Sequence, residues 1–166
     1  VPVGASKRIA INSESNVVHS PVIGSHPFLK ESLKAFVKYI GSNDKKALKL
    51  AKNHFKKLKI KTKSVNSFSE TETAKLLCTS YYGMCIVWHD YINKVCKKNN
   101  TSFEFIKEWN LNYNKGYKKL GFEKYTRPIL EAPQGGKIGG HCIIPNAKLL
   151  NNQFHHLLLD ELLKYE

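Results

Sequence analysis

Apolar residues in the first third of the chain form short runs or alternate with polar residues. Both patterns are typical of β-strands, which we expect at residues 17–19, 37–40 and 60–65. Between them, residues 28–36 and 44–58 carry apolar side chains at helical spacing. Strands that alternate with helices predict an α/β fold for the N-terminal third.

The rest of the chain is expected to be mainly α-helical. Apolar residues recur at helical spacing in three stretches, residues 70–98, 101–120 and 146–165. Residues 121–145 are rich in glycine and proline, and we expect a loop there. Polar side chains mark three expected helix starts: Ser42 or Asn43, Ser69 with Glu72 in a capping box, and Thr101 or Ser102.

The stretch at residues 70–98 predicts a long central helix, about 43 Å in length at 1.5 Å per residue. Cys78, Cys85 and Cys96 fall on one stripe of this helix, and we expect them to be small core residues. Tyr81 and Trp88 are among the apolar residues that widen the stripe. A helix with so much apolar surface is expected to be buried and to form the contact of a homodimer.

Composition excludes several classes of protein. The chain has 166 residues, 42% of them hydrophobic and 24% charged, which is ordinary for a globular protein. No apolar run reaches the roughly 18 residues of a membrane span, and no signal-peptide core is present. Four cysteines without a C-x-x-C pair predict neither a disulfide scaffold nor a metal site. We therefore expect a reduced, cytoplasmic protein.

The net charge of +14 comes mostly from one segment. Residues 30–63 hold 12 Lys residues against Glu31 and Asp44, and no Arg. Arg is the side chain expected for bidentate contacts to phosphates or guanine, so this composition argues against nucleic acid as a partner. The lysines fit the solvated face of the helix predicted at residues 44–58, with a basic nucleic-acid-binding surface as the alternative.

Candidate chemistry is concentrated in residues 127–146. Four glycines there would bring backbone amides close to a bound ligand: Gly135, Gly136, Gly139 and Gly140. Cys142 follows them and precedes the last predicted helix, whose N-terminus favours a reactive thiolate. The alternative is a flexible loop with a bystander cysteine.

Four motifs, in this order along the chain, resemble the nucleotide-sugar (UDP-glucose/GDP-mannose) dehydrogenase family in its N-acetylhexosamine branch. The family's Thr-Val-Pro-x-Gly-Thr, Ser-Pro-Glu, Glu-x-x-Lys-x-x-x-Asn and Gly-x-Gly-Gly-His-Cys-Ile-Pro-x-Asp-Pro segments are similar to four segments of this chain. These segments are Val1-Pro-Val-Gly4, His19-Ser-Pro21, Glu72-x-x-Lys75 and Gly139-Gly-His-Cys142-Ile-Ile-Pro-Asn146. Together they span about residues 1–150.

The resemblance implies a long central dimerisation helix and oxidation of the C6 hydroxyl of a nucleotide sugar to a carboxylate, with two hydride transfers to NAD. Cys142 would be the nucleophile that captures the aldehyde and then carries a thioester, and Lys75 would stabilise the oxyanion. Thr79 and Asn146 would complete the catalytic set. The implied substrate-binding residues are Arg127, Gly135, Gly136, Lys137, Gly139, Gly140, His141 and His26.

The sequence departs from the family pattern at three polar positions. Val22 stands in place of the Glu after Ser-Pro, Thr79 in place of Asn, and Asn146 in place of Asp. Asn cannot act as a general base. These replacements favour the alternative of a non-catalytic dimerisation or binding module on the same scaffold.

The glycine fingerprint Gly-x-Gly-x-x-Gly of a dinucleotide-binding turn does not occur in the chain. We therefore expect a C-terminal portion that does not bind NAD alone. Its expected parts are an α/β remnant after a missing NAD-binding domain at residues 1–66, a helical dimerisation region at 67–120, and a sugar-nucleotide loop with a C-terminal helix at 121–166. The expected partners are a nucleotide sugar and a second copy of the chain, with no membrane.

Overall fold

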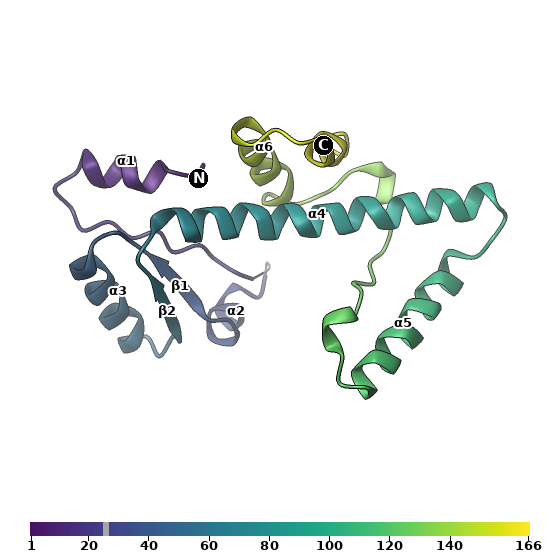
Figure 1. The fold of residues 1–166 in the computed structure, drawn as a ribbon, viewed down its shortest axis with the longest axis horizontal. Helices are drawn as coiled ribbons and strands as arrows, with labels where there is room; N and C mark the ends of the chain where they lie inside the picture. Colours follow the sequence, from purple (N-terminus) through teal and green to yellow (C-terminus); the bar gives the residue numbers. More distant parts are fainter. Residues whose placement is uncertain (25–26) are drawn as a thin grey trace. The chain divides into compact units, whose positions relative to one another are not determined.

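The computed structural model describes residues 1–24 and 27–166, which divide into two compact units. The first unit comprises residues 1–78 and 152–154, and the second comprises residues 79–151 and 155–166. Figure 1 shows the order of the elements, with the long helix α4 (Phe68–Lys98) running from the first unit into the second. A small parallel sheet in the first part and mainly helical structure after it confirm the predicted fold class.

A parallel pair of strands lies at the centre of the first unit. β1 (Lys38–Gly41) pairs with β2 (Thr62–Val65), and α3 (Lys45–Lys57) connects them. Ile40 of β1 and Ala47 of α3 are buried almost completely. All three elements lie within two residues of their predicted bounds, because apolar spacing and turn residues agree here.

The cap expected for α3 is wrong. Asp44 is the N-cap, and its carboxylate accepts a hydrogen bond from the backbone N–H of Lys46 at 2.7 Å. Ser42 is buried and donates its hydroxyl to the carbonyl of Val17 at 2.7 Å. Three polar residues precede the helix, and tertiary contacts decide which of them becomes the cap.

The C-terminus of α3 has an unusual residue in its left-handed position. The N–H of Ile60 donates to the carbonyl of Phe55, and the N–H of Lys59 donates to that of Lys56, which is the pattern of a Schellman motif. Lys59 has a φ of 57°, in a position that usually holds glycine. Lysine therefore strains the backbone at this turn.

Residues 17–19 do not form the predicted strand. Of these residues only His19 pairs, in an isolated antiparallel bridge to Gly41 with N···O distances of 2.8 Å in both directions. Pro21 lacks the N–H that would continue a ladder, so pairing stops. Two short helices also belong to this unit: α1 (Ala5–Ile11), which the pattern did not predict, and α2 (Leu29–Ala35), which it did.

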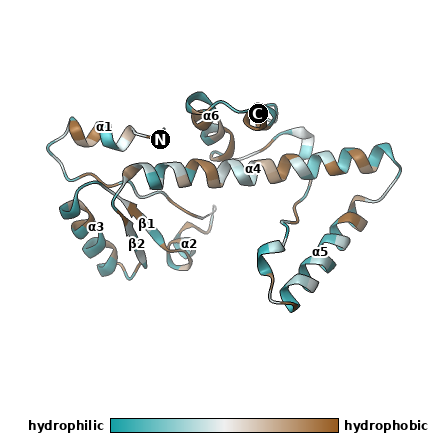
Figure 2. Ribbon diagram, in the orientation of Figure 1, coloured by the Kyte–Doolittle hydropathy of each residue, from teal (hydrophilic) through white to brown (hydrophobic). Residues whose placement is uncertain are grey.

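Helix α4 begins at Phe68, so Ser69 lies inside the helix and not at its cap. The Ser67 hydroxyl accepts instead from the N–H of Glu70 at 3.3 Å. Figure 2 shows that the middle of α4 is hydrophobic whereas α3 is largely hydrophilic. The buried positions of α4 extend from its first turn toward its end: Phe68, Thr71, Glu72, Leu76, Ser80, Gly83, His89, Asp90 and Cys96.

The predicted burial of the cysteine stripe is wrong for part of its length. Cys96 is buried, Cys85 is half-buried and Cys78 is exposed. Tyr81 and Trp88 are exposed as well, at 63% and 59% of their surface. A shared helix face does not ensure shared burial, because different segments of the chain cover different turns of a long helix.

Helix α5 (Phe103–Lys119) begins at one of the two predicted caps, Ser102, whose hydroxyl accepts from the N–H of Phe105 at 3.2 Å. The following loop contains two short 3₁₀ turns, Glu123–Tyr125 and Gln134–Gly136. The sequence pattern therefore located this helix and the loop after it correctly.

The single helix predicted at residues 146–165 is two helices, α6 (Ile143–Gln153) and α7 (Leu157–Leu163). His156 caps α7 by accepting a backbone N–H at 3.2 Å, and its own N–H donates to the side chain of Asn151 at 3.0 Å. These side-chain bonds compete with those of a continuous helix, and the chain turns between the two.

Candidate active site

The candidate nucleophile, Cys142, lies in the second unit directly before α6, and its thiol is exposed. Its carbonyl accepts the N–H of Asn146 at 3.2 Å, which is the first hydrogen bond of α6. Pro145 is tolerated in this first turn because the N–H groups there have no intrahelical partner. The thiol therefore lies at the positive end of a helix dipole.

Two contacts anchor the short segment that carries Cys142. On one side, the N–H of Ile138 donates to the carbonyl of Tyr165 at 2.8 Å, and the Ile138 side chain is buried. On the other side, Ile143 packs so closely on α4 that a Cβ on Gly83 would lie 2.6 Å from its Cγ2. The exposed residues between these anchors thus have limited freedom.

The glycines of this loop are favoured by the conformation of the backbone and not by close packing. Gly136 and Gly140 have φ values of 68° and 92°, which favour glycine strongly. A Cβ on any of the four predicted glycines would meet no atom within 4 Å; the four are Gly135, Gly136, Gly139 and Gly140. Open space beside these residues leaves room for a ligand next to Cys142.

A buried acid holds the end of the chain against α4 in the same unit. The hydroxyl of Tyr165 donates to Asp90 at 2.7 Å, and the ammonium of Lys94 lies 2.7 Å from the same carboxylate oxygen. Burial acts to raise the pKa of Asp90, but the hydrogen bonds from Lys94 and Tyr165 outweigh it and hold the pKa below the ordinary value. Asp90 is therefore ionised at neutral pH.

Three further residues expected at the site also belong to the second unit. The guanidinium of Arg127 stacks on the ring of Tyr113 at 3.4 Å, and the backbone of Arg127 exchanges two hydrogen bonds of 2.8 Å with Asn114 of α5. Arg127 thus belongs to an aromatic cluster on α5. Lys137 and His141 are exposed on the glycine-rich loop.

Lys75 belongs to the first unit and donates to the carbonyl of Val22 at 3.0 Å. The neighbouring ammonium of Lys38 donates to the carbonyls of Ser20 and Pro21, each at 3.0 Å. Burial lowers the pKa of Lys38, and the charge of Lys75 lowers it further. Backbone carbonyls of residues 20–22 therefore contact both ammonium groups, where the family pattern has a glutamate after Ser-Pro.

Glu72 has a role that its sequence spacing did not indicate. Its buried carboxylate accepts the N–H of Gly4 at 2.7 Å and that of Ser6 at 2.8 Å, which caps α1 from a distant part of the chain. Burial acts to raise the pKa of Glu72, but hydrogen bonds from Ser6 and Gly4 and the charge of His19 lower it overall.

Beside Glu72, the Nδ1 of His19 lies 2.8 Å from the hydroxyl of Thr71. That hydroxyl donates its hydrogen to the carbonyl of Phe68, so it accepts from His19, whose Nδ1 carries the proton. Burial lowers the pKa of His19, which favours the neutral ring. The last expected site residue, His26, lies outside the described residues.

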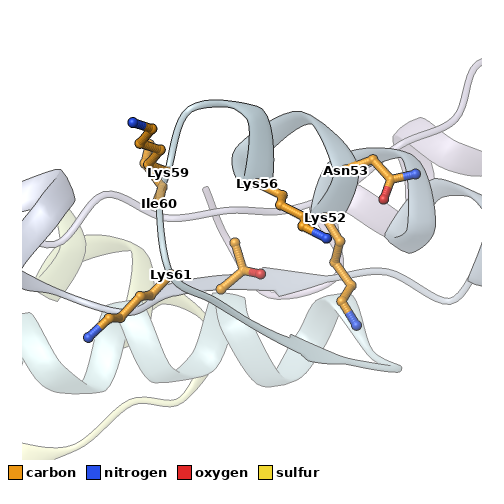
Figure 3. Close-up of a pocket in the computed structure, with 7 residues that line it drawn as sticks. Lys52, Asn53, Lys56, Lys59, Ile60 and Lys61 are labelled. Carbon is orange, nitrogen blue, oxygen red and sulfur yellow. The ribbon is translucent and has the colours of Figure 1, made fainter.

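Two hollows, of about 440 and 360 Å³, adjoin each other along α3 and β2 and share Lys52 and Asn53. Figure 3 shows the larger one, where the ammonium groups of Lys59 and Lys61 point away from those of Lys52 and Lys56. A phosphate site needs donors that converge on one position. The divergent side chains support the interpretation of a solvated lysine face.

Within residues 1–24 and 27–166, no three His, Cys, Asp or Glu side chains gather as ligands of a metal ion would. None of the helices in this described part is long and apolar enough to cross a membrane.

No protein-family model matches the sequence, and a search by sequence finds no characterised protein that matches. The fold is similar to solved structures of two dehydrogenases. UDP-D-ManNAc dehydrogenase from Pyrococcus horikoshii aligns with 99% of this chain at a TM-score of 0.77 and 16% identity. The UDP-N-acetyl-mannosamine dehydrogenase Cap5O from S. aureus aligns with 98% of it at a TM-score of 0.60 and 21% identity.

The chain spans 39% of the length of each of these enzymes. At such identities the similarity establishes the fold. At the level of the fold, it confirms the resemblance that four short motifs had indicated. The chain has the fold of one part of a UDP-N-acetylmannosamine dehydrogenase.

Proposed function

We propose that this chain is the nucleotide-sugar-binding region of a UDP-sugar 6-dehydrogenase-like protein, with Cys142 as its nucleophile. The observation that carries the proposal is an exposed thiol at the start of α6, after a loop whose glycines have open space beside them. The names of the two structural relatives specify UDP-N-acetylmannosamine, which supports a UDP-N-acetylhexosamine as the substrate class.

The step proposed for Cys142 is capture of the C6 aldehyde of the sugar. The sulfur forms a bond to C6, the carbonyl π bond breaks, and the oxygen takes up a proton, which gives a thiohemiacetal. Backbone N–H groups in the first turn of α6 stabilise negative charge that develops at the sulfur and oxygen. These N–H groups have no intrahelical partners, so they are available to a ligand.

NAD, which the family uses as hydride acceptor, does not fit the described residues. The parallel unit β1–α3–β2 has the connectivity of a dinucleotide-binding motif, but the carboxylate of Asp44 already accepts the N–H of Lys46 at the start of α3. A pyrophosphate would have to displace this negative charge from the helix N-terminus. We propose that a domain joined to this region, or another chain, holds NAD.

The other catalytic roles follow from the motif positions. Lys75 is proposed to stabilise the oxyanion, and Thr79 and Asn146 to orient the water that hydrolyses the thioester. A hydroxyl and an amide can hydrogen-bond this water but cannot take its proton at neutral pH. The proposal therefore predicts slow thioester hydrolysis relative to a protein that has Asp in place of Asn146.

We further propose that the protein is a homodimer through α4. Four large side chains on this helix are 53–63% exposed in the isolated chain: Leu77, Tyr81, Trp88 and Tyr91. The rings of Trp88 and Tyr91 stack at a centroid distance of 5.4 Å. A second copy would cover these apolar surfaces.

A non-catalytic dimerisation or binding module is the second candidate, and Asn146 is the observation that favours it. It would bind the same nucleotide sugar without using the thiol. Cys142→Ser separates the two candidates. If Cys142 is the nucleophile, the substitution abolishes thiohemiacetal formation and leaves binding largely unchanged. If the chain is a binding module, no thiohemiacetal forms in the wild type either.

The test of the proposed function is protection of Cys142 from alkylation. Purified protein is treated with iodoacetamide, with and without UDP-N-acetylmannosamine, and the labelling of each cysteine is followed by peptide mass spectrometry. Cys78, which is also exposed, serves as the reference thiol. We expect at least fivefold slower labelling of Cys142 alone, and no effect of ADP-ribose. Equal labelling of Cys142 with and without the UDP-sugar would contradict the proposal.

A further inference from the structure

A backbone hydrogen bond tethers the glycine-rich loop to Tyr165, a residue outside every motif discussed so far. Tyr165 follows α7, and its carbonyl accepts the N–H of Ile138 at 2.8 Å. Ile138 is four residues before Cys142 and is the buried residue of the loop. The position of the loop therefore depends on the position of Tyr165.

Tyr165 is in turn held by its side chain. Its hydroxyl donates to Asp90 at 2.7 Å, and Asp90 is 5% exposed. Lys94 pairs with the same carboxylate oxygen at 2.7 Å and lies over the Tyr165 ring at 5.5 Å. A hydrogen bond to a buried charge is among the stronger kinds, so the ring is fixed against α4.

We propose that Asp90 and Tyr165 are positioning residues for the segment that carries Cys142. Asp90 on α4 orients Tyr165, and the carbonyl of Tyr165 holds Ile138, so that residues 139–142 span a fixed gap between Ile138 and Ile143. In this proposal both residues act through the loop and not on a reacting atom. The effect on Cys142 as a nucleophile rests on the proposed function, whereas the tether itself is a property of the fold.

The surrounding structure explains why this tether is needed. A side chain on any of the four loop glycines would meet open space, so packing around these residues does little to fix the loop. Gly139 to Cys142 are all exposed. With the Ile138 end released, the segment would be held at its other end alone, by α6, whose Ile143 packs against Gly83.

Tyr165→Phe tests the proposal, because it removes the hydroxyl while it keeps the ring and the backbone carbonyl. Hydrogen–deuterium exchange of the peptide that contains residues 138–142 should become about tenfold faster, which corresponds to about 1.4 kcal/mol. Asp90→Asn, which keeps the shape of the side chain, should have a similar effect. Lys148→Gln is the matched control: it removes the exposed pair of Lys148 with Glu166 at 2.5 Å, beside Tyr165, and should leave the exchange within twofold of wild type.

A purely structural role would destabilise the whole unit and not the loop alone. Labelling of Cys96, which is buried in α4, reports such global opening and should not change in Tyr165→Phe. Unchanged exchange in the loop, or equally faster exchange throughout together with Cys96 labelling, would overturn the proposal. If the loop loosens as expected but UDP-N-acetylmannosamine fails to protect Cys142 in wild type, the tether stands and the proposed function fails.

Discussion

Ile143 occupies the space that a side chain at position 83 would need. A Cβ on Gly83 would lie 2.6 Å from Cγ2 of Ile143 and 2.9 Å from Cδ1 of Leu162, closer than packed atoms approach. α6 and α7 therefore contact α4 at this glycine. The residue after Cys142 is fixed because α4 has no side chain at that point.

Gly83→Ala should destabilise the protein by about 1–3 kcal/mol, because overpacking forces Ile143 and Leu162 to move. Gly116→Ala on α5 is the control, since no atom lies within 4 Å of its added Cβ. This second substitution should stabilise its helix by about 0.5–1 kcal/mol. Urea denaturation followed by circular dichroism measures both, and the two changes in free energy of unfolding should have opposite signs.

Acid should loosen the first unit in two steps. His19 has a lowered pKa, so its contribution to stability is complete above its ordinary value of 6.5 and declines as the pH falls below it. Glu72 also has a lowered pKa, so its contribution is complete above 4.5 and is lost at lower pH. Thermal denaturation between pH 7.5 and 3.5 should show both losses.

Glu72→Gln isolates the acidic step of this profile. The amide keeps the size of the side chain but removes the charge, and we expect a loss of about 1–3 kcal/mol at pH 7. The variant should then lose less stability than wild type below pH 4.5, while the decline near pH 6.5 remains. An unchanged profile in the variant would mean that Glu72 does not hold α1 as described.

Lys59→Gly should stabilise the protein by about 1 kcal/mol, because glycine adopts the left-handed conformation at the end of α3 without strain. Lys52→Gly is a suitable contrast, because Lys52 is exposed in the middle of α3 and glycine there should cost about 1 kcal/mol. The free energy of unfolding in urea distinguishes the two. Destabilisation by Lys59→Gly would show that the turn needs the lysine side chain.

Trp88→Lys should convert the proposed dimer into a monomer at micromolar concentration, because it places a charge in the apolar contact of α4. Trp109→Lys on α5 is the matched control, since Trp109 is 63% exposed and Trp88 is 59% exposed. Sedimentation velocity should show a dimer for wild type and Trp109→Lys. A wild-type monomer at these concentrations would contradict the proposed interface.

The 166-residue chain alone should neither bind NAD nor reduce it with a UDP-sugar. The carboxylate of Asp44 at the N-terminus of α3 leaves its βαβ unit unsuited to a pyrophosphate. Isothermal titration with NAD and absorbance at 340 nm test the two statements. NADH formation by the purified chain would show that the chain binds the dinucleotide, and would contradict the prediction.

Local patterns predicted the parts of the fold that depend on neighbouring residues. α3 and α5 follow from apolar spacing and polar caps, and the cap of α5 at Ser102 is one of the two expected. α1 was missed because its N-terminus is capped by Glu72, more than 60 residues away. The break between α6 and α7 was missed because the side chain of Asn151 takes the N–H of His156.

The candidate site divides in the same way. The position of Cys142 after the glycines and before a helix could be predicted, because a motif carries it. The contact of Lys75 with the carbonyl of Val22 could not, since a backbone acceptor leaves no trace in residue type. Tyr165 was equally hidden, because its carbonyl, and not its side chain, holds the loop.

The side-chain amide of Gln153 joins two segments of the first unit that lie far apart in the sequence. It accepts the N–H of Val3 at 2.8 Å and donates to the carbonyl of Val3 at 3.1 Å, so residue 3 is paired 150 positions later. During translation Val3 therefore lacks this partner until Gln153, 150 positions later, has left the ribosome. Nascent chains halted before α6 should present the segment around Val3 undocked to proteases and chaperones, and release of the last helical turn of α6 should end that exposure.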